Sequence, residues 1–381
     1  MKNRYTVYGD KAFDAMIDEY MVQIKDAVLE VMPEEYLSAL ILGGGYGRGE
    51  GGVFIENGRM ELYNDFDFFV ISNNLSRAKM NEYYHKLFEV GEKLTEKIGI
   101  DVDFGPFRNI SDLANMKFTM MWYELKQAHI VIYGDDKILD AIPDFKAEEI
   151  PLSEAMGLTL NRSVGLLLAK QRLENVENLT TPDKDFIERN IYKAAMAAGD
   201  AFLICNHIFN HSYVARMDLM DQFKDDKIIK ENKFLELYKR SILYKLKPVR
   251  KNLSHKELSS LHSEVLDIYK KFFLFVAGKA WRCEFADFKS FGETVLCSKI
   301  DADSPIQILK NMILNIKEVG GPFSLRWFLK YPRYRLFYAV PYFAFMDKTY
   351  EENIPAVLGL DSAASEEEKL QQFLRLWERF N

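Results

Sequence analysis

Apolar residues recur every three to four positions across residues 11–31, and this spacing predicts an amphipathic helix. The Gly9-Asp10 pair just before it offers a capping side chain at the expected place. The apolar positions are Phe13, Met16, Ile17, Tyr20, Ile24, Val28 and Val31. A second amphipathic helix is predicted over 75–98, and a shorter helix over 121–126.

Short apolar runs between these helices have the length of buried strands. The predicted strands cover 38–42, 66–71, 99–107 and 129–133. The third of them is expected to end at Gly105-Pro106. Between 53 and 62, Asn57-Gly58 separates two arms that contain apolar residues, which is a strong signal for a β-hairpin.

The pattern changes after Pro151, where helical spacing replaces the mixture of strands and helices. Helices are predicted over 152–174, 182–207, 218–245, 255–277 and 365–380. A domain boundary is placed near 145–152, where Pro143 and Pro151 fall, and Gly320-Gly321-Pro322 is taken as a second break. The predicted domains are an α+β domain over 1–148, an α-helical domain over 149–318 and a C-terminal helical extension over 319–381, packed on the helical domain.

Composition limits the function classes without choosing one. The chain has 381 residues, of which 48% are hydrophobic and 28% charged, as in ordinary globular proteins. Its formal net charge of −7 makes nucleic acid a less expected partner, although local basic patches remain compatible with it. Three cysteines at unrelated positions suggest neither a disulfide framework nor a zinc site. With no signal-like N-terminus and no long apolar run, we expect a cytoplasmic protein without a membrane partner.

The residues with the clearest chemistry lie between 40 and 103. An apolar run ends in a glycine cluster that begins Gly43-Gly44-Gly45, and glycines let a backbone approach phosphates closely. Asp65 and Asp67 are two positions apart at the start of a predicted strand, so their side chains share one face. Asp101 and Asp103 accompany the next predicted strand and offer a third carboxylate. Carboxylates converging from two strands predict a site for Mg²⁺ or Mn²⁺ beside a phosphate-binding turn.

This combination resembles the DNA polymerase β-like nucleotidyltransferase superfamily. The resemblance rests on Gly44-Gly45, Arg48, Gly49, Asp65, Asp67 and Asp103, and it covers roughly residues 38–135. The stretch from Gly44 to Glu50 is most similar to the bacterial uridylyltransferases that modify nitrogen-regulatory proteins. The resemblance implies a small mixed sheet flanked by helices, with an α-helical domain after it. It also implies transfer of a nucleoside monophosphate from a nucleoside triphosphate (NTP) to an acceptor hydroxyl, with release of pyrophosphate.

The resemblance further implies roles for individual residues. Asp65, Asp67 and Asp103 would be the catalytic metal ligands, with Asp101 left open as the alternative to Asp103. Gly44 and Gly45 would open a helix that touches the phosphates, with Arg48 beside it. Lys193, on the predicted helix over 182–207, would reach the triphosphate; the alternative is a solvated lysine. The spacing from Gly45 to Asp65 is longer than is usual in the superfamily, and the predicted hairpin would absorb the excess.

Other functions remain compatible with the same residues. One alternative is a nucleotide-binding regulatory or toxin–antitoxin-type module with little turnover, and another is an RNA tailing enzyme. A literal dinucleotide motif, Gly47-x-Gly49-x-x-Gly52, is disfavoured because a hairpin pattern follows it instead of a helix. The acidic chain favours a small molecule or a protein as the acceptor. The sequence does not identify the base of the NTP.

Overall fold

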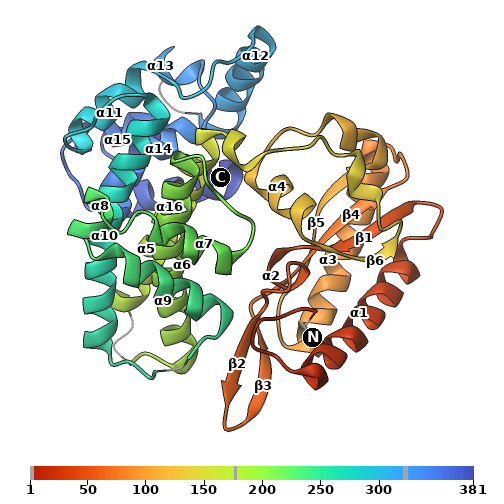
Figure 1. Cartoon of the computed structure of the whole chain (residues 1–381). Helices are drawn as coiled ribbons and strands as arrows, with labels where there is room; N and C mark the ends of the chain where they lie inside the picture. The colour runs from red at the N-terminus through yellow and green to blue at the C-terminus, as the bar shows by residue number, and fades with distance from the viewer. Residues whose placement is uncertain (1–3, 176–177, 250, 321–324) are drawn as a thin grey trace. The chain divides into compact units, whose positions relative to one another are not determined.

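The computed structural model describes residues 4–175, 178–249, 251–320 and 325–381. The chain forms two compact units, which Figure 1 shows with the element labels used below. The first unit joins Met1–Ile150 to Phe209–Asp221 and Lys239–Arg250; the second contains Pro151–Ile208, Gln222–Tyr238 and Lys251–Asn381. The two later segments of the first unit fall within the stretch that the sequence predicted as one helical domain. Gly321 and Pro322 of the predicted break lie outside the described residues.

A small mixed sheet forms the centre of the first unit, as the α+β prediction requires. Its strands, in spatial order, are β5 (Val102–Asn109), β4 (Phe66–Ser72), β1 (Leu37–Leu42) and β6 (Ile130–Gly134). β4 runs parallel to β5, whereas β1 is antiparallel to both β4 and β6. The first unit also contains the helices α1 (Lys11–Val31), α2 (Gly44–Gly47), α3 (Arg77–Ile98), α4 (Met120–Gln127) and α7 (Tyr213–Asp221).

Both faces of this sheet are covered, which explains why its central strands are continuously apolar. Leu40 of β1 and Phe68 of β4 belong to the core beneath α1 and α3. Their neighbours Ile41 and Phe69 belong to a second core with Trp122 of α4. Side chains alternate between the two faces of a strand, so each central strand contributes to both cores.

The predicted hairpin and the predicted early helices are confirmed. β2 (Gly52–Glu56) and β3 (Arg59–Tyr63) form a separate antiparallel two-stranded sheet. Asn57 and Gly58 both have positive φ angles, 52° and 77°, as a two-residue turn of type I′ requires. The residues from α1 to β6 therefore follow the order expected from the sequence.

Two boundary predictions are wrong. β5 does not end at Gly105-Pro106 but continues to Asn109, with an irregular register opposite β4 between Phe68 and Val70. β5 is an edge strand, where a proline without an N–H group is tolerated at a bulge. The single helix expected over 218–245 is divided into α7, α8 (Lys227–Glu231) and α9 (Phe234–Leu246). Asp226 caps α8, and Lys233 has a left-handed φ of 49° that interrupts the helical path before α9.

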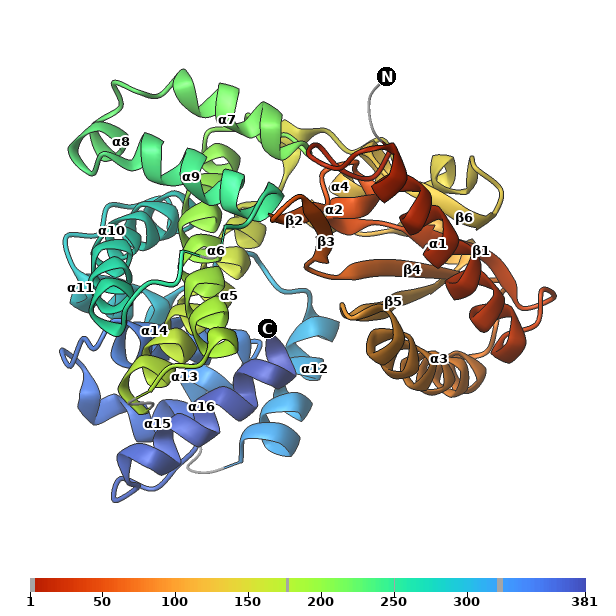
Figure 2. The same ribbon diagram turned by 90° about the horizontal axis from the view of Figure 1, so that it is seen from below.

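The second unit is helical. Its long helices α5 (Leu152–Asn175), α6 (Thr181–Cys205) and α10 (His255–Trp281) pack against one another, and Figure 2 shows α5 and α6 side by side. Besides α8, the second unit contains α11 (Phe288–Cys297), α12 (Pro305–Leu314), α13 (Leu325–Phe328), α14 (Arg333–Ala344), α15 (Ile354–Leu358) and α16 (Glu366–Phe380). Short 3₁₀ segments occur at Ile110–Asn115, Ile138–Ala141, Ala147–Glu149 and Glu351–Asn353, and a π turn at Asn315–Val319.

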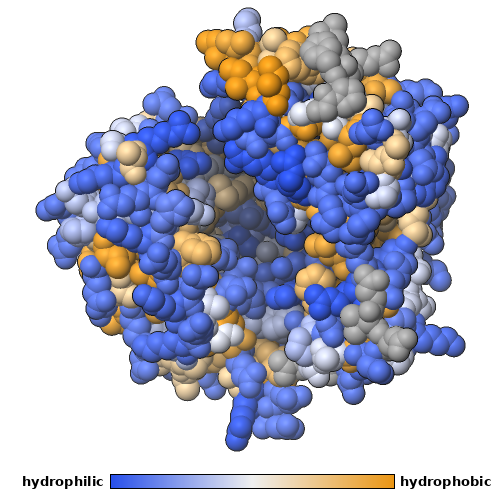
Figure 3. Space-filling model, turned by 180° about the vertical axis from the view of Figure 1, so that it is seen from behind, coloured by the Kyte–Doolittle hydropathy of each residue, from blue (hydrophilic) through white to orange (hydrophobic). Residues whose placement is uncertain are grey.

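One apolar helix face of the second unit is exposed. Ile306, Leu309 and Ile313 of α12, with Ile316 in the π turn after it, are each more than half exposed. The patch is visible in orange at the top of the space-filling view in Figure 3. No described helix is long and apolar enough to cross a membrane.

Candidate active site

Three carboxylates converge at the start of β4 and β5. Asp65 directly precedes β4, and Asp67 lies on β4 opposite Asp103 of β5. One oxygen of each carboxylate lies within 4.8 Å of the others, a spacing that suits a shared metal ion. Asp101 is outside this group, and its backbone carbonyl accepts a hydrogen bond from the N–H of Phe66 at 2.8 Å. The geometry therefore brings together Asp65, Asp67 and Asp103, which we call the aspartate triad.

The triad concentrates negative charge. Burial, together with the charges of Asp65 and Asp103, raises the pKa of Asp67 to about 7, against the opposing effects of Lys245 and Arg48. Burial and the neighbouring Asp65 and Asp101 also raise the pKa of Asp103. Like charges at short distance disfavour ionisation of one another. Carboxylate oxygens are the ligands that Mg²⁺ and Mn²⁺ prefer, so a divalent cation would offset this repulsion.

The glycine turn lies against the triad. Gly44 has a φ angle of +58°, and a Cβ atom at this position would lie 1.9 Å from Oδ2 of Asp67. Glycine adopts this positive φ angle without strain, and it alone has no side chain to clash with the Asp67 carboxylate. The N–H of Gly43 donates to the carbonyl of Asp67 at 2.8 Å, which fixes the turn to β4. Gly44 and Gly45 open α2, as the sequence analysis expected, although α2 has only four residues.

Arg48 is held beneath the glycine turn instead of facing solvent. Its side chain is 5% exposed and lies 3.3 Å from the carboxylate of Glu124, measured from Nη1 to Oε2. Its guanidinium lies 4.8 Å from the ring centroid of Tyr213. Among the described residues, its buried Nε has no hydrogen-bond partner. The predicted contact with a phosphate would therefore use this nitrogen or require the ion pair with Glu124 to open.

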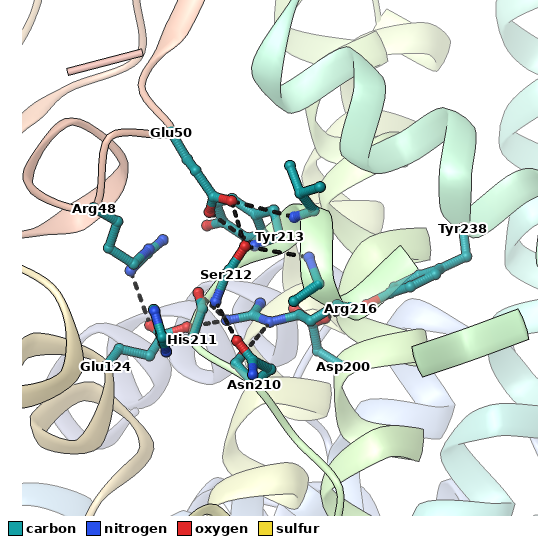
Figure 4. A network of polar contacts seen from close by, with 12 residues as sticks. Arg48, Glu50, Glu124, Asp200, Asn210, His211, Ser212, Tyr213, Arg216 and Tyr238 are labelled. Atoms are coloured by element: carbon teal, nitrogen blue, oxygen red, sulfur yellow. Dashed lines mark hydrogen bonds and ion pairs between the residues drawn. The ribbon is translucent and has the colours of Figure 1, made fainter. Parts of the chain in front are cut away.

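Glu50 joins the glycine turn to a segment more than 160 positions later in the chain (Figure 4). Glu50 is buried, with 5% of the residue exposed. Its carboxylate accepts hydrogen bonds from the Ser212 hydroxyl at 2.6 Å and from the N–H groups of Tyr213 at 2.8 Å and Val214 at 3.2 Å. Glu50 therefore caps the N-terminus of α7, where a negative charge is favoured. No local pattern in the sequence predicts this contact, because its partners are more than 160 positions apart.

Arg216 completes the buried network around this segment. Its side chain is 2% exposed, donates to the carbonyl of His211 and forms an ion pair with Glu124. Glu124 thus joins Arg48 to Arg216, as Figure 4 shows. We call Arg48, Glu50, Glu124 and Arg216 the buried ionic network. No sequence motif marks Glu124 or Arg216, because their roles arise from contacts between distant segments.

Lys245, near the end of α9, is another residue to which the sequence assigned no role. Its charge acts on Asp67 and lowers the pKa of that carboxyl, so its ammonium lies within electrostatic range of the triad. The segment is positioned by neighbouring contacts: the Tyr244 hydroxyl lies 3.4 Å from the Tyr63 hydroxyl of the hairpin. A Cβ atom at Gly52 would lie 2.9 Å from the carbonyl oxygen of Lys245. Lys193 lies on α6 in the second unit, and its contact with a triphosphate stays a prediction.

A cavity of about 540 Å³ adjoins the triad between α3 and β5. Asp103 borders it, and the exposed rings of Tyr84 and Phe88 form part of its wall. This volume is in the range of small-molecule sites. The cavity therefore offers space for a small molecule beside one of the triad carboxylates.

Comparison of the chain with protein families, with curated proteins and with solved structures finds no match.

Replacing Asp67 with asparagine is expected to stabilise the metal-free protein at pH 8. The raised pKa means that the folded state binds more protons than the unfolded state between about pH 4 and 7, so wild-type stability falls as pH rises through this range. The gain from Asp67→Asn should be roughly 1–4 kcal/mol at pH 8 and small at pH 4. Urea unfolding with EDTA at both pH values measures it. An equal gain at pH 4 and pH 8 would show that the ionised Asp67 carboxylate is not the source of the instability.

Removing the Glu50 carboxylate is expected to loosen residues 209–221. Glu50→Ala leaves two backbone N–H groups and one hydroxyl without their acceptor, at a cost of roughly 2–4 kcal/mol. Hydrogen exchange should then speed up in 209–221 more than in β4. Glu61→Ala, at an exposed position on β3, is the matched control and should leave both segments unchanged.

Proposed function

We propose that this protein is a metal-dependent nucleotidyltransferase with a DNA polymerase β-like catalytic fold in its first unit. The observation that carries the proposal is the aspartate triad lying against Gly44, whose missing side chain leaves room for Asp67. The order of glycine turn, Asp65, Asp67 and Asp103 along two neighbouring strands agrees with the resemblance found in the sequence. The mixed α+β architecture and the helical region after it are compatible with this assignment.

The donor set fits a divalent cation. Three carboxylate oxygens within 4.8 Å of one another are hard, anionic ligands, and their mutual repulsion is relieved when a cation joins them. Asp65, Asp67 and Asp103 would hold Mg²⁺ or Mn²⁺. The bound cation would stabilise negative charge on the phosphates and lower the pKa of the attacking hydroxyl.

In the proposed reaction, the acceptor oxygen attacks the α-phosphorus of an NTP. A new oxygen–phosphorus bond forms, the bond to the β-phosphate oxygen breaks, and pyrophosphate leaves. We assign the proton of the acceptor hydroxyl to Asp103, which is exposed and borders the cavity. Lys245, whose charge acts on Asp67, is our candidate for binding the triphosphate from the first unit.

A nucleotide-binding module with little turnover is the second candidate. It is favoured by Arg48, whose ion pair with Glu124 occupies the side chain that the resemblance assigns to the phosphates. Pyrophosphate release distinguishes the two candidate functions. A nucleotide-binding module would bind NTP with metal but release no pyrophosphate with any acceptor, whereas a nucleotidyltransferase would release it. An RNA tailing enzyme would instead show RNA binding that weakens steeply with salt.

Substitution of the triad should remove transfer without unfolding the protein. Asp65→Asn and Asp103→Asn are each expected to lower pyrophosphate release at least about 100-fold, because each carboxylate would stabilise charge at the reacting phosphate. Asp101→Asn is the matched control: it lies two residues from Asp103 but outside the triad. Equal losses in Asp101→Asn and Asp103→Asn would contradict the assigned site.

NTP binding should depend on the divalent cation and on Lys245. Millimolar ATP, UTP, CTP or GTP is expected to raise the melting temperature only with Mg²⁺ or Mn²⁺, by mass action on the folded state. Lys245→Met should raise the Kd of the bound NTP about tenfold, equivalent to 1.4 kcal/mol. Lys247→Met, in the same segment but over the Tyr8 ring, is the control. An unchanged Kd in Lys245→Met would remove Lys245 from the phosphate site.

A further inference from the structure

A second cavity lies in the helical unit, at the end of α10. Its volume is about 810 Å³, within the range of pockets for small molecules. It is lined by Lys271, Leu274, Phe275, Gly278, Lys279, Arg282, Cys283, Glu284 and Phe285. All of these residues belong to the second unit, so the cavity is independent of the aspartate triad.

The cavity follows from how α10 ends. Lys271, Phe275 and Gly278 recur at three- and four-residue spacing and share one side of the helix, whereas Phe272 and Phe273 are buried. Arg282 has a left-handed φ of 58°, after which the chain turns back. The N–H of Cys283 donates to the carbonyl of Gly278 at 3.0 Å. Residues 283–285 thereby form a second wall of the cavity.

Positive charge predominates in this cavity although the whole chain is acidic. Three cationic side chains line it against the single carboxylate of Glu284. The Lys279 ammonium lies 5.4 Å from the ring centroid of Phe275, and Nζ of Lys271 donates to Asn232 at 2.6 Å. Within the described parts of the chain, neither Lys279 nor Arg282 forms an ion pair.

These cations are not needed to end the helix. The N–H of Arg282 already donates to the carbonyls of Gly278 and Lys279, so backbone groups satisfy the final turn. The cationic side chains thus remain available to an anion, while Leu274, Phe275 and Phe285 offer apolar contact next to them. Charge-assisted hydrogen bonds would hold an anionic group at one end of a ligand, and the aromatic rings would pack against an apolar body at its other end.

We propose that this cavity binds a small organic anion: an aromatic or aliphatic body that carries a carboxylate, sulfonate or phosphate group. The anionic group contacts Lys271, Lys279 and Arg282. The apolar body lies against Phe275 and Phe285. The site is separate from the proposed nucleotidyl transfer, and neither depends on the other.

Cys283 provides a local reporter for the site. It lines the cavity and is exposed, whereas Cys205 is buried. The remaining exposed thiol is Cys297, which Cys297→Ser removes. In this full-length variant, the rate of alkylation of Cys283 by iodoacetamide can be followed by mass spectrometry while a ligand is titrated.

The probe is 8-anilinonaphthalene-1-sulfonate, an aromatic sulfonate whose fluorescence rises on binding. We expect saturable binding at one site and, at saturation, a decrease of at least about tenfold in the alkylation rate of Cys283. Lys279→Gln and Arg282→Gln should each raise the Kd about tenfold. Lys289→Gln, an exposed lysine outside the cavity, is the control and should bind as before. The neutral analogue N-phenyl-1-naphthylamine should protect Cys283 much less.

Three results would overturn the proposal. The first is fluorescence that rises without protection of Cys283, which would place the probe elsewhere, for example on the exposed face of α12. The second is equal protection by the neutral analogue, which would remove the role of charge. The third is an equal loss of affinity in Lys289→Gln and Lys279→Gln. Because the substituted side chains are exposed, circular dichroism is expected to show all variants folded.

Discussion

The buried ionic network is the constraint on which the first unit depends. Buried charges are tolerated only when partners surround them, and removing one partner leaves another charge uncompensated. Glu50 therefore requires the N-terminus of α7, and Glu124 requires both Arg48 and Arg216. These contacts attach residues 209–221 to the glycine turn and to α4, which makes the first unit discontinuous in sequence. The position of the glycine turn, and with it Gly44, is secured by a segment far along the chain.

The aspartate triad differs from the buried ionic network in that its members all carry charges of the same sign. There, three like charges are brought together, and the pKa of Asp67 rises because burial and its neighbours disfavour the ionised form. The missing side chain of Gly44 is part of the same arrangement, since the Asp67 carboxylate occupies the space that a Cβ atom there would fill. The three carboxylates therefore lie close enough together to hold a metal ion, at a cost in local electrostatic energy.

The net charge of the chain does not predict the charge of its individual cavities. The chain carries a formal charge of −7, yet the two cavities described above differ in sign. The one beside Asp103 is bordered by carboxylates, and the one at the end of α10 is bordered mainly by cations. The sign of each follows from the charged residues that border it, so the charge of a cavity cannot be read from the net charge of the chain.

The sequence alone determined most of the local elements and two of the three carboxylates, Asp65 and Asp67. Periodicity located α1 and α3, Asn57-Gly58 located the hairpin turn, and the two-residue spacing of Asp65 and Asp67 placed both on one face. These features depend on neighbours within a few positions, so a local pattern suffices. The choice between Asp101 and Asp103 needed the register of β4 against β5. The continuation of β5 past Pro106 depended on its place at the sheet edge. The roles of Glu50, Arg216 and Lys245 arise from segments more than 90 residues apart, and only tertiary packing decides which distant charges meet.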